Sequence, residues 1–188
     1  MDAALVRQVS CLLIALAFVA AAATAQSGPS QPAKPAVDVT KAMLDAAAKI
    51  GASALKPGVS VSDRNIAISD TGGYNVSIAY VTRPATTTMS GTVLAHEKIT
   101  EIYYVVSGRG THLTGQLTDG TPLADSTTIG PSWSSKVPIK NGRVTSLGPG
   151  EMQIIPPGTG HVWTEIAEGG IVYMVIRIDP EHLLALSK

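Results

Sequence analysis

The stretch GEMQIIPPGTGHVWTE, residues 150–165, decides the fold of this chain. It reads as a strand that enters a turn rich in proline and glycine, after which a second strand begins at His161. Because alternate side chains of a strand share a face, we expect His161, Trp163 and Glu165 to point the same way. An imidazole at the start of such a strand lies either in water at the rim of a sheet or among groups that form a site.

A second stretch, HEKITEIYYVVSGRG at 96–110, has the same character. His96 follows an apolar segment in which Leu94 shares its face, and Glu101 opens an apolar strand in which Tyr103 shares its face. A carboxylate at the head of an apolar strand favours an inward role. Two histidines and one carboxylate near strand ends are therefore available to meet inside one barrel.

Nearly everything between residues 59 and 178 indicates β structure. The candidate strands, which are short and alternate in polarity, are 74–83, 91–96, 101–107, 151–156, 161–166 and 171–178. Glycine-rich turns, among them Gly108-Arg109-Gly110 and Gly169-Gly170, separate them. Such a pattern predicts an all-β antiparallel sandwich or barrel. Residues 118–142 have no clear period and are interpreted as a long insertion, of the kind that often carries function.

Helices are expected only at the two ends of this domain. Thr40 can cap a helix over 41–55, which has a weak apolar stripe and stops at Lys56-Pro57-Gly58. The last residues, 179–188, read as a short C-terminal helix. The predicted domain therefore spans 40–188, with its barrel at about 59–178.

The N-terminus reads as a targeting segment. An uncharged apolar run from Cys11 to Ala23 ends in Ala23-Thr24-Ala25, which is typical of a secretory signal peptide cleaved after Ala25. Residues 26–39 are rich in Pro, Ser and Gln and are predicted to form a disordered leader. We therefore expect a secreted or periplasmic protein with no membrane attachment after cleavage.

Composition excludes several classes of partner. The chain has 14 basic and 14 acidic residues and no basic run, so it offers nothing to nucleic acid or to an anionic membrane. Its single cysteine, Cys11, lies in the predicted signal peptide, so the mature chain has no disulfide and no thiol chemistry. What remains is long enough for one domain with a sizeable core.

Taken together, the two stretches resemble the motifs of the cupin superfamily, which are small jelly-roll barrels. The first family motif is commonly H-x-H, three or four residues, E, six residues and G, and the second is G, five residues, P-x-G, two residues, H, three residues and N. This chain has Leu94-x-His96, four residues, Glu101, six residues and Gly108, then Gly150, five residues, Pro156-x-Gly158, two residues, His161, three residues and Glu165. Leu94 stands where the family usually has its first histidine, and Glu165 replaces the asparagine.

The resemblance implies a small single-domain cupin that binds a divalent metal. Carried over residue by residue, the ligands are His96, Glu101 and His161, a set that suits non-haem Fe(II) and could equally hold Zn, Mn or Ni. His112 is a candidate to complete the shell in place of Leu94. The pocket is expected to be lined by Leu94, Tyr103, His112, Trp163 and Glu165.

Function remains open at this point, because one barrel hosts many activities. The first interpretation is a metal-dependent enzyme that acts on a small molecule as a dioxygenase, isomerase or lyase. The alternative is a metal-free cupin that binds a sugar or acid, or a structural cupin with a vestigial site. The resemblance also implies that a homodimer is plausible.

We predict that export removes residues 1–25 and leaves Gln26 at the N-terminus, because the apolar run is short and ends in small residues. Intact-mass measurement of the exported protein tests this. A mass that retains residues 1–25 would contradict it and indicate an uncleaved anchor.

Overall fold

The computed structural model describes residues 33–124 and 126–188. The predicted signal peptide and most of the predicted leader lie outside the described residues; residues 33–39 have neither helix nor strand. The helix α1, Lys41–Ala54, begins where the sequence predicts, with the Thr40 side chain accepting a hydrogen bond from the backbone N–H of Met43. Among the described residues, no helix combines the length and apolarity needed to cross a membrane.

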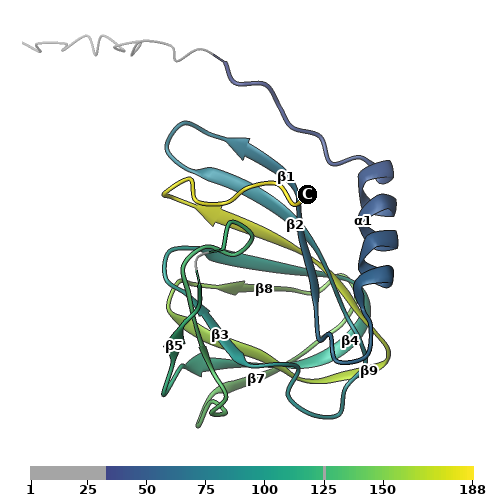
Figure 1. The fold of residues 1–188 in the computed structure, drawn as a ribbon, viewed down its shortest axis with the longest axis vertical. Helices are drawn as coiled ribbons and strands as arrows, with labels where there is room; N and C mark the ends of the chain where they lie inside the picture. The colour runs from purple at the N-terminus through teal and green to yellow at the C-terminus, as the bar shows by residue number, and fades with distance from the viewer. Residues whose placement is uncertain (1–32, 125) are drawn as a thin grey trace, which may run out of the picture. The chain divides into compact units, whose positions relative to one another are not determined.

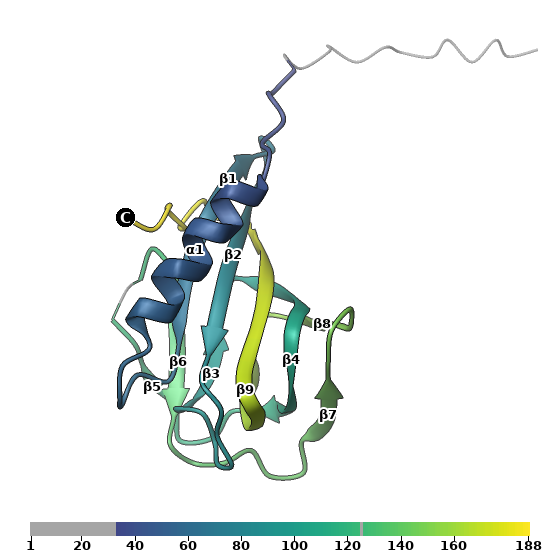
Figure 2. The ribbon, with the colours of Figure 1, turned by 90° about the vertical axis from the view of Figure 1, so that its right-hand side faces the viewer.

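The predicted all-β architecture is confirmed, since every described strand pair is antiparallel (Figure 1). The strands are β1 Ser62–Asp70, β2 Asn75–Arg83, β3 Val93–His96, β4 Thr100–Gln116, β5 Thr121–Pro122, β6 Ser132–Ser135, β7 Arg143–Leu147, β8 Met152–Ile155 and β9 Thr159–Asp179. β9 is central, because it pairs with β2, β3 and β4. The result is a jelly-roll barrel with α1 packed on the outside against β1 and β2 (Figure 2).

The core fills the inside of this barrel. Alternate residues of β2, β4 and the C-terminal half of β9 point inward, as their period of two predicts. The main buried cluster comprises Ala79, Val81, Tyr103, Val105, Leu147, Ile155, Trp163, Ile166, Ile171, Tyr173 and Val175. Tyr103, Trp163 and Tyr173 form its aromatic centre, with ring centroids 4.7 to 6.4 Å apart.

Two glycine segments predicted as turns instead lie inside long strands. Gly108-Arg109-Gly110 belongs to β4 and Gly169-Gly170 to β9, where the ladder between the two strands is irregular. Gly108 and Gly170 have φ of +78° and +80°, and a Cβ on Gly108 would lie 2.1 Å from the carbonyl oxygen of Gly170. Glycine thus permits a bend and a close approach of two backbones without ending either strand.

The predicted insertion at 118–142 is only partly irregular. It contains β5 and β6, and β6 pairs with β3 in an antiparallel register that places Ser132 opposite His96. β6 is the sequence Ser-Trp-Ser-Ser, which has no apolar alternation, so its pattern gave no strand signal.

The predicted C-terminal helix is wrong for residues 179–188. After Asp179 the chain has no helix, and its backbone N–H groups are bound by distant parts of the fold. The Asp179 carboxylate accepts from the N–H of Leu184, Thr127 O accepts from Ala185, and Asn65 O accepts from Ser187. These long-range bonds outweigh the tendency of a segment too short to be stable as a helix on its own.

We predict that Gly108→Ala destabilises the fold more than Gly150→Ala. Both positions have positive φ, so alanine is strained at either one by about 1 to 2 kcal/mol. Only at Gly108 does the added methyl group meet backbone, since nothing lies within 4 Å of a Cβ at Gly150. Urea unfolding should show an extra loss of at least about 1 kcal/mol for Gly108→Ala; equal losses would contradict the close-approach explanation.

Candidate metal centre

Three buried side chains from different strands converge at one point inside the barrel. His96 ends β3, Glu101 is the second residue of β4, and His161 is near the start of β9. Glu101 Oε2 lies 3.3 Å from His96 Nε2 and 3.5 Å from His161 Nε2, and the three ligand atoms all lie within 4.8 Å of one another. Ligand atoms about 3 to 3.5 Å apart suit metal–ligand bonds of about 2.0 to 2.2 Å. The structure therefore brings together the residues that the sequence predicts as ligands.

Hydrogen bonds on the far side of each ring fix both histidine tautomers. The Ser132 hydroxyl donates to Gly130 O (2.9 Å), so its oxygen accepts the proton of His96 Nδ1, 2.8 Å away. His161 Nδ1 lies 3.0 Å from Thr159 O, which can only accept, so this nitrogen also carries a proton. In the neutral rings, both Nε2 atoms therefore present lone pairs. Histidine ligands of metals are usually oriented by such a second bond.

The triad contains buried polar atoms without a hydrogen-bond partner. His96 Nε2 and Glu101 Oε2 are buried, and neither forms a hydrogen bond within the described residues, although they lie close together. The Nδ1 bonds give each ring, in its neutral form, an Nε2 lone pair that faces the Glu101 carboxylate oxygen. A divalent cation would satisfy all three atoms, so these residues fit a metal of the kind that the resemblance implies.

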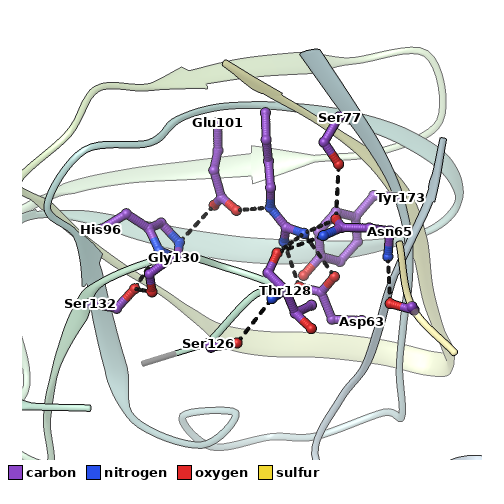
Figure 3. A network of polar contacts seen from close by, with 12 residues as sticks. Asp63, Asn65, Ser77, His96, Glu101, Ser126, Thr128, Gly130, Ser132 and Tyr173 are labelled. Carbon is purple, nitrogen blue, oxygen red and sulfur yellow. Dashed lines mark hydrogen bonds and ion pairs between the residues drawn. The ribbon is translucent and has the colours of Figure 1, made fainter. Parts of the chain in front are cut away.

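The other oxygen of Glu101 is held by a buried arginine. Arg177 of β9 donates from Nε to Glu101 Oε1 (2.8 Å) and from its two terminal nitrogens to both carboxylate oxygens of Asp63. Nη1 also donates to Asn65 Oδ1 (2.8 Å) and Thr128 O (3.1 Å). Figure 3 shows Glu101 between His96 on one side and the group around Asp63 and Asn65 on the other. This network fixes the carboxylate with Oε2 turned toward the histidines.

The environment keeps Glu101 and His161 in the protonation states that a metal needs. Burial by itself would raise the pKa of Glu101, but the neighbouring His96 and Arg177 outweigh it and hold that pKa well below its usual range. Burial lowers the pKa of His161 to about 4, although Glu101 acts in the opposite direction. Near neutral pH the site therefore offers an ionised carboxylate and a neutral imidazole at His161.

The cavity around the triad has a volume of about 350 Å³, which is large enough for a small organic molecule. Of the residues predicted to line it, Leu94, Tyr103, His112 and Trp163 do so. Leu94 lies directly opposite His161 in the pairing of β3 with β9. The wall is thus apolar where the family usually has its first histidine.

Glu165, which the sequence also predicts in the pocket, is exposed and lies outside it. The cause is a bulge in β9, because His112 pairs with Trp163 while Thr111 pairs with Glu165, leaving Thr164 as an extra residue. One extra residue reverses the alternation of faces, so Trp163 and Ile166 point inward and Glu165 points out. A prediction from sequence spacing alone assumes that side chains alternate between the two faces without interruption.

His112 lines the cavity but does not join the group of converging ligand atoms. Its Nδ1 donates to Gln153 Oε1 (2.6 Å), and its ring lies 4.6 Å from that of Trp163, centroid to centroid. Burial lowers its pKa to about 3, so it stays neutral. In this structure the predicted completion of the metal shell by His112 does not occur.

The sequence reasoning missed the polar residues that support the triad. Asp63, Arg83, Ser132 and Arg177 were not singled out, yet each contacts a ligand residue or lines the cavity. For Arg177 a signal existed, since it is the only charge in the apolar strand IVYMVIRI, residues 171–178. A lone charge at an inward position of a buried strand requires partners.

Both motif strands of the sequence thus line one antiparallel jelly-roll barrel and deliver their histidines and glutamate to a single interior point. The chain has a cupin fold.

Comparisons with known proteins add nothing on activity. No family model matches the chain, and no curated protein matches it. Solved structures similar to this chain include KdgF from Halomonas sp., with 16% identity, a TM-score of 0.39, and coverage of 68% of this chain and 84% of that one.

Two other similar structures are cupins of different kinds. A cupin protein from Bacteroides fragilis has 18% identity and a TM-score of 0.35, covering 61% of this chain and 73% of that one. The cupin domain of CENP-C from Drosophila melanogaster has 13% identity and a TM-score of 0.36, covering 59% and 69%. Similarity at this distance transfers no substrate or reaction.

We predict that Arg177→Met destabilises the protein by about 3 to 5 kcal/mol, because it leaves the buried Glu101 and the partly buried Asp63 without their cation. Adding Glu101→Gln to this variant should recover part of the loss, since one of the two uncompensated charges is removed. Denaturant unfolding of the two single variants and the double variant measures the coupling. Strict additivity would show that the pair does not interact energetically.

Proposed function

We propose that this cupin binds a divalent metal through His96, Glu101 and His161 and acts as a metal-dependent enzyme on a small molecule inside the barrel. One observation carries the proposal: the Nε2 atoms of His96 and His161 and an oxygen of the Glu101 carboxylate meet within the barrel, with both Nδ1 atoms bound elsewhere. The bound metal would supply Lewis acidity or a centre for oxygen chemistry. Iron, zinc, manganese and nickel all suit this set of ligands.

The chain's own residues prepare this site in three ways. Ser132 and Thr159 orient the two imidazoles, so that neither ring has to reorganise on binding. Arg177 takes one oxygen of Glu101 and leaves the other as a single ligand atom. Leu94, Tyr103 and Trp163 line the cavity beside the triad, whose side chains are buried, and burial strengthens electrostatic interactions. Three protein ligands would leave positions for a substrate, as catalytic metal sites require.

A metal-free cupin that binds a small ligand is the second candidate, and two observations favour it. Leu94 replaces the usual fourth ligand by an apolar side chain. Glu101 already has a cationic partner in Arg177, so its charge is partly compensated without a metal. Elemental analysis of untagged protein, purified from its native compartment, separates the two candidates: stoichiometric metal supports the first, and its absence after exposure to all four metals supports the second.

The proposal extends to the setting of the protein. The signal-like N-terminus supports export to the periplasm or the medium, where a small molecule would be the natural partner. A homodimer is part of the proposal on the strength of the family resemblance. Sedimentation of the mature protein tests the assembly.

We predict that Leu94→His strengthens metal binding by an order of magnitude or more. Position 94 lies opposite His161 and borders the same cavity, so a histidine there would add a fourth ligand with little change in the backbone. With limiting metal the variant should melt higher than the parent, since metal at about 100 times its dissociation constant stabilises the native state by roughly 2.7 kcal/mol. Without metal it should melt lower, because a buried imidazole without a partner is costly.

His161→Ala is the matched control and should abolish the metal-dependent gain in both backgrounds. If Leu94→His melts lower under every metal tested, position 94 belongs to an apolar wall of a metal-free pocket, and the second candidate becomes the better one.

A further inference from the structure

A second arginine, Arg83 at the end of β2, lines the same cavity as the triad. Its Nε donates to the hydroxyl of Tyr173 (2.8 Å), and its Nη1 lies 3.2 Å from the Ser90 hydroxyl and 3.4 Å from Ser60 O. All of these partners are neutral oxygens. These hydrogen bonds orient the guanidinium group of Arg83 without neutralising its charge.

Arg83, unlike Arg177, has no anionic partner among the described residues. Within residues 33–124 and 126–188, no carboxylate pairs with Arg83, and its Nη2 donates no hydrogen bond. The side chain is only partly buried, whereas Arg177 is 1% exposed and pairs with two carboxylates. A guanidinium held in a cavity with one free face is a donor for an incoming anion.

The charges of the cavity lining also favour an anionic ligand. Its charged side chains are Asp63, Arg83, Glu101 and Arg177, whose formal charges sum to zero. The two carboxylates are both bound by Arg177, so the positive charge of Arg83 faces the cavity without opposition. A divalent metal at the triad would add two further positive charges. The cavity then favours a negatively charged molecule that reaches both the metal and Arg83.

We infer that the ligand of this site is a small carboxylate whose carboxyl group binds Arg83, with another of its polar groups directed to the triad. This inference rests on the proposed function for the second contact only. A carboxylate fits better than a phosphate, because one free guanidinium face offers a planar fork for a single charge. The hydroxyl-bearing residues Ser60, Ser90 and Thr92 also line the cavity, so hydroxylated carboxylates are the natural probes.

The test compares pairs of probes that differ only in the carboxylate. Glycolate, glycerate and gluconate are titrated by calorimetry against ethylene glycol, glycerol and glucitol, with inorganic phosphate as a further arm. Each titration uses the mature protein in metal-free form and after loading with Zn²⁺ or Mn²⁺, and metal content is measured afterwards. At least one carboxylate should bind about tenfold or more tightly than its uncharged partner.

Variants assign the effect to Arg83. Arg83→Met should remove the preference for the carboxylate, Arg83→Lys should keep part of it, and Arg143→Met, which changes an exposed arginine on β7, should leave affinity within about twofold. If Arg83→Met does not fold, the paired probes on the unaltered protein and the Arg83→Lys variant still decide the matter.

The outcomes separate this inference from the proposed function. Failure to take up metal, with the carboxylate preference intact, would refute the metal site and support the Arg83 site. Metal uptake without any carboxylate preference would do the reverse. Binding of no carboxylate in the series, tighter binding of phosphate, or a preference that survives Arg83→Met would each overturn the inference.

Discussion

The structure depends on the buried ion pairs of Arg177 with Glu101 and Asp63. Burying a guanidinium that is 1% exposed would cost too much free energy without partners. Here its hydrogen-bond partners are acceptors from β1, β4 and the segment before β6. The same contacts that make the charge tolerable also join three parts of the chain that are distant in sequence. Asn65 extends the network, because its amide donates to backbone carbonyls of the 127–128 segment and of Ala185. Fold and site therefore share one set of interactions.

Because of this arrangement, the Glu101 carboxylate can stabilise the fold and also present an oxygen to the candidate metal site. One oxygen of Glu101 belongs to the Arg177 network and is fixed by it, while the other faces His96 and His161. The two histidines are fixed in a different way, through Nδ1 bonds to Ser132 and Thr159. Each ligand atom is thus positioned by a bond made elsewhere in its own side chain. Such preorganisation keeps the geometry ready for a cation without requiring rearrangement.

The two arginines of the cavity have different consequences because their partners differ. Arg177 forms ion pairs with two carboxylates, whereas Arg83 is bound only by neutral oxygens of Tyr173, Ser60 and Ser90. The first stabilises the protein and orients a ligand atom. The second leaves a positive charge at the wall of a cavity that also holds the triad. Leu94 keeps the side of the cavity between β3 and β9 apolar.

The sequence by itself determined the class of fold and the three converging residues. Alternation with a period of two is a local property, and it correctly placed Glu101 and Tyr103 on one inward face and His96 beside Leu94. Fixed spacing around a proline–glycine turn did the same for His161. These inferences hold because strand geometry depends on neighbouring residues in the chain.

Tertiary structure decided what local periodicity cannot encode. The bulge at Thr164 reversed the face of Glu165, and glycine bends extended the predicted strand 101–107 into β4 and merged 161–166 with 171–178 in β9. Long-range hydrogen bonds replaced the expected C-terminal helix, and the pairing of β6 with β3 brought Ser132 to His96. The partners of Arg83 and Arg177 come from strands and loops far away in sequence, so only the folded chain shows that one arginine is neutralised and the other is not. The ligand set follows from spacing along strands, whereas the charge that surrounds it follows from which strands meet.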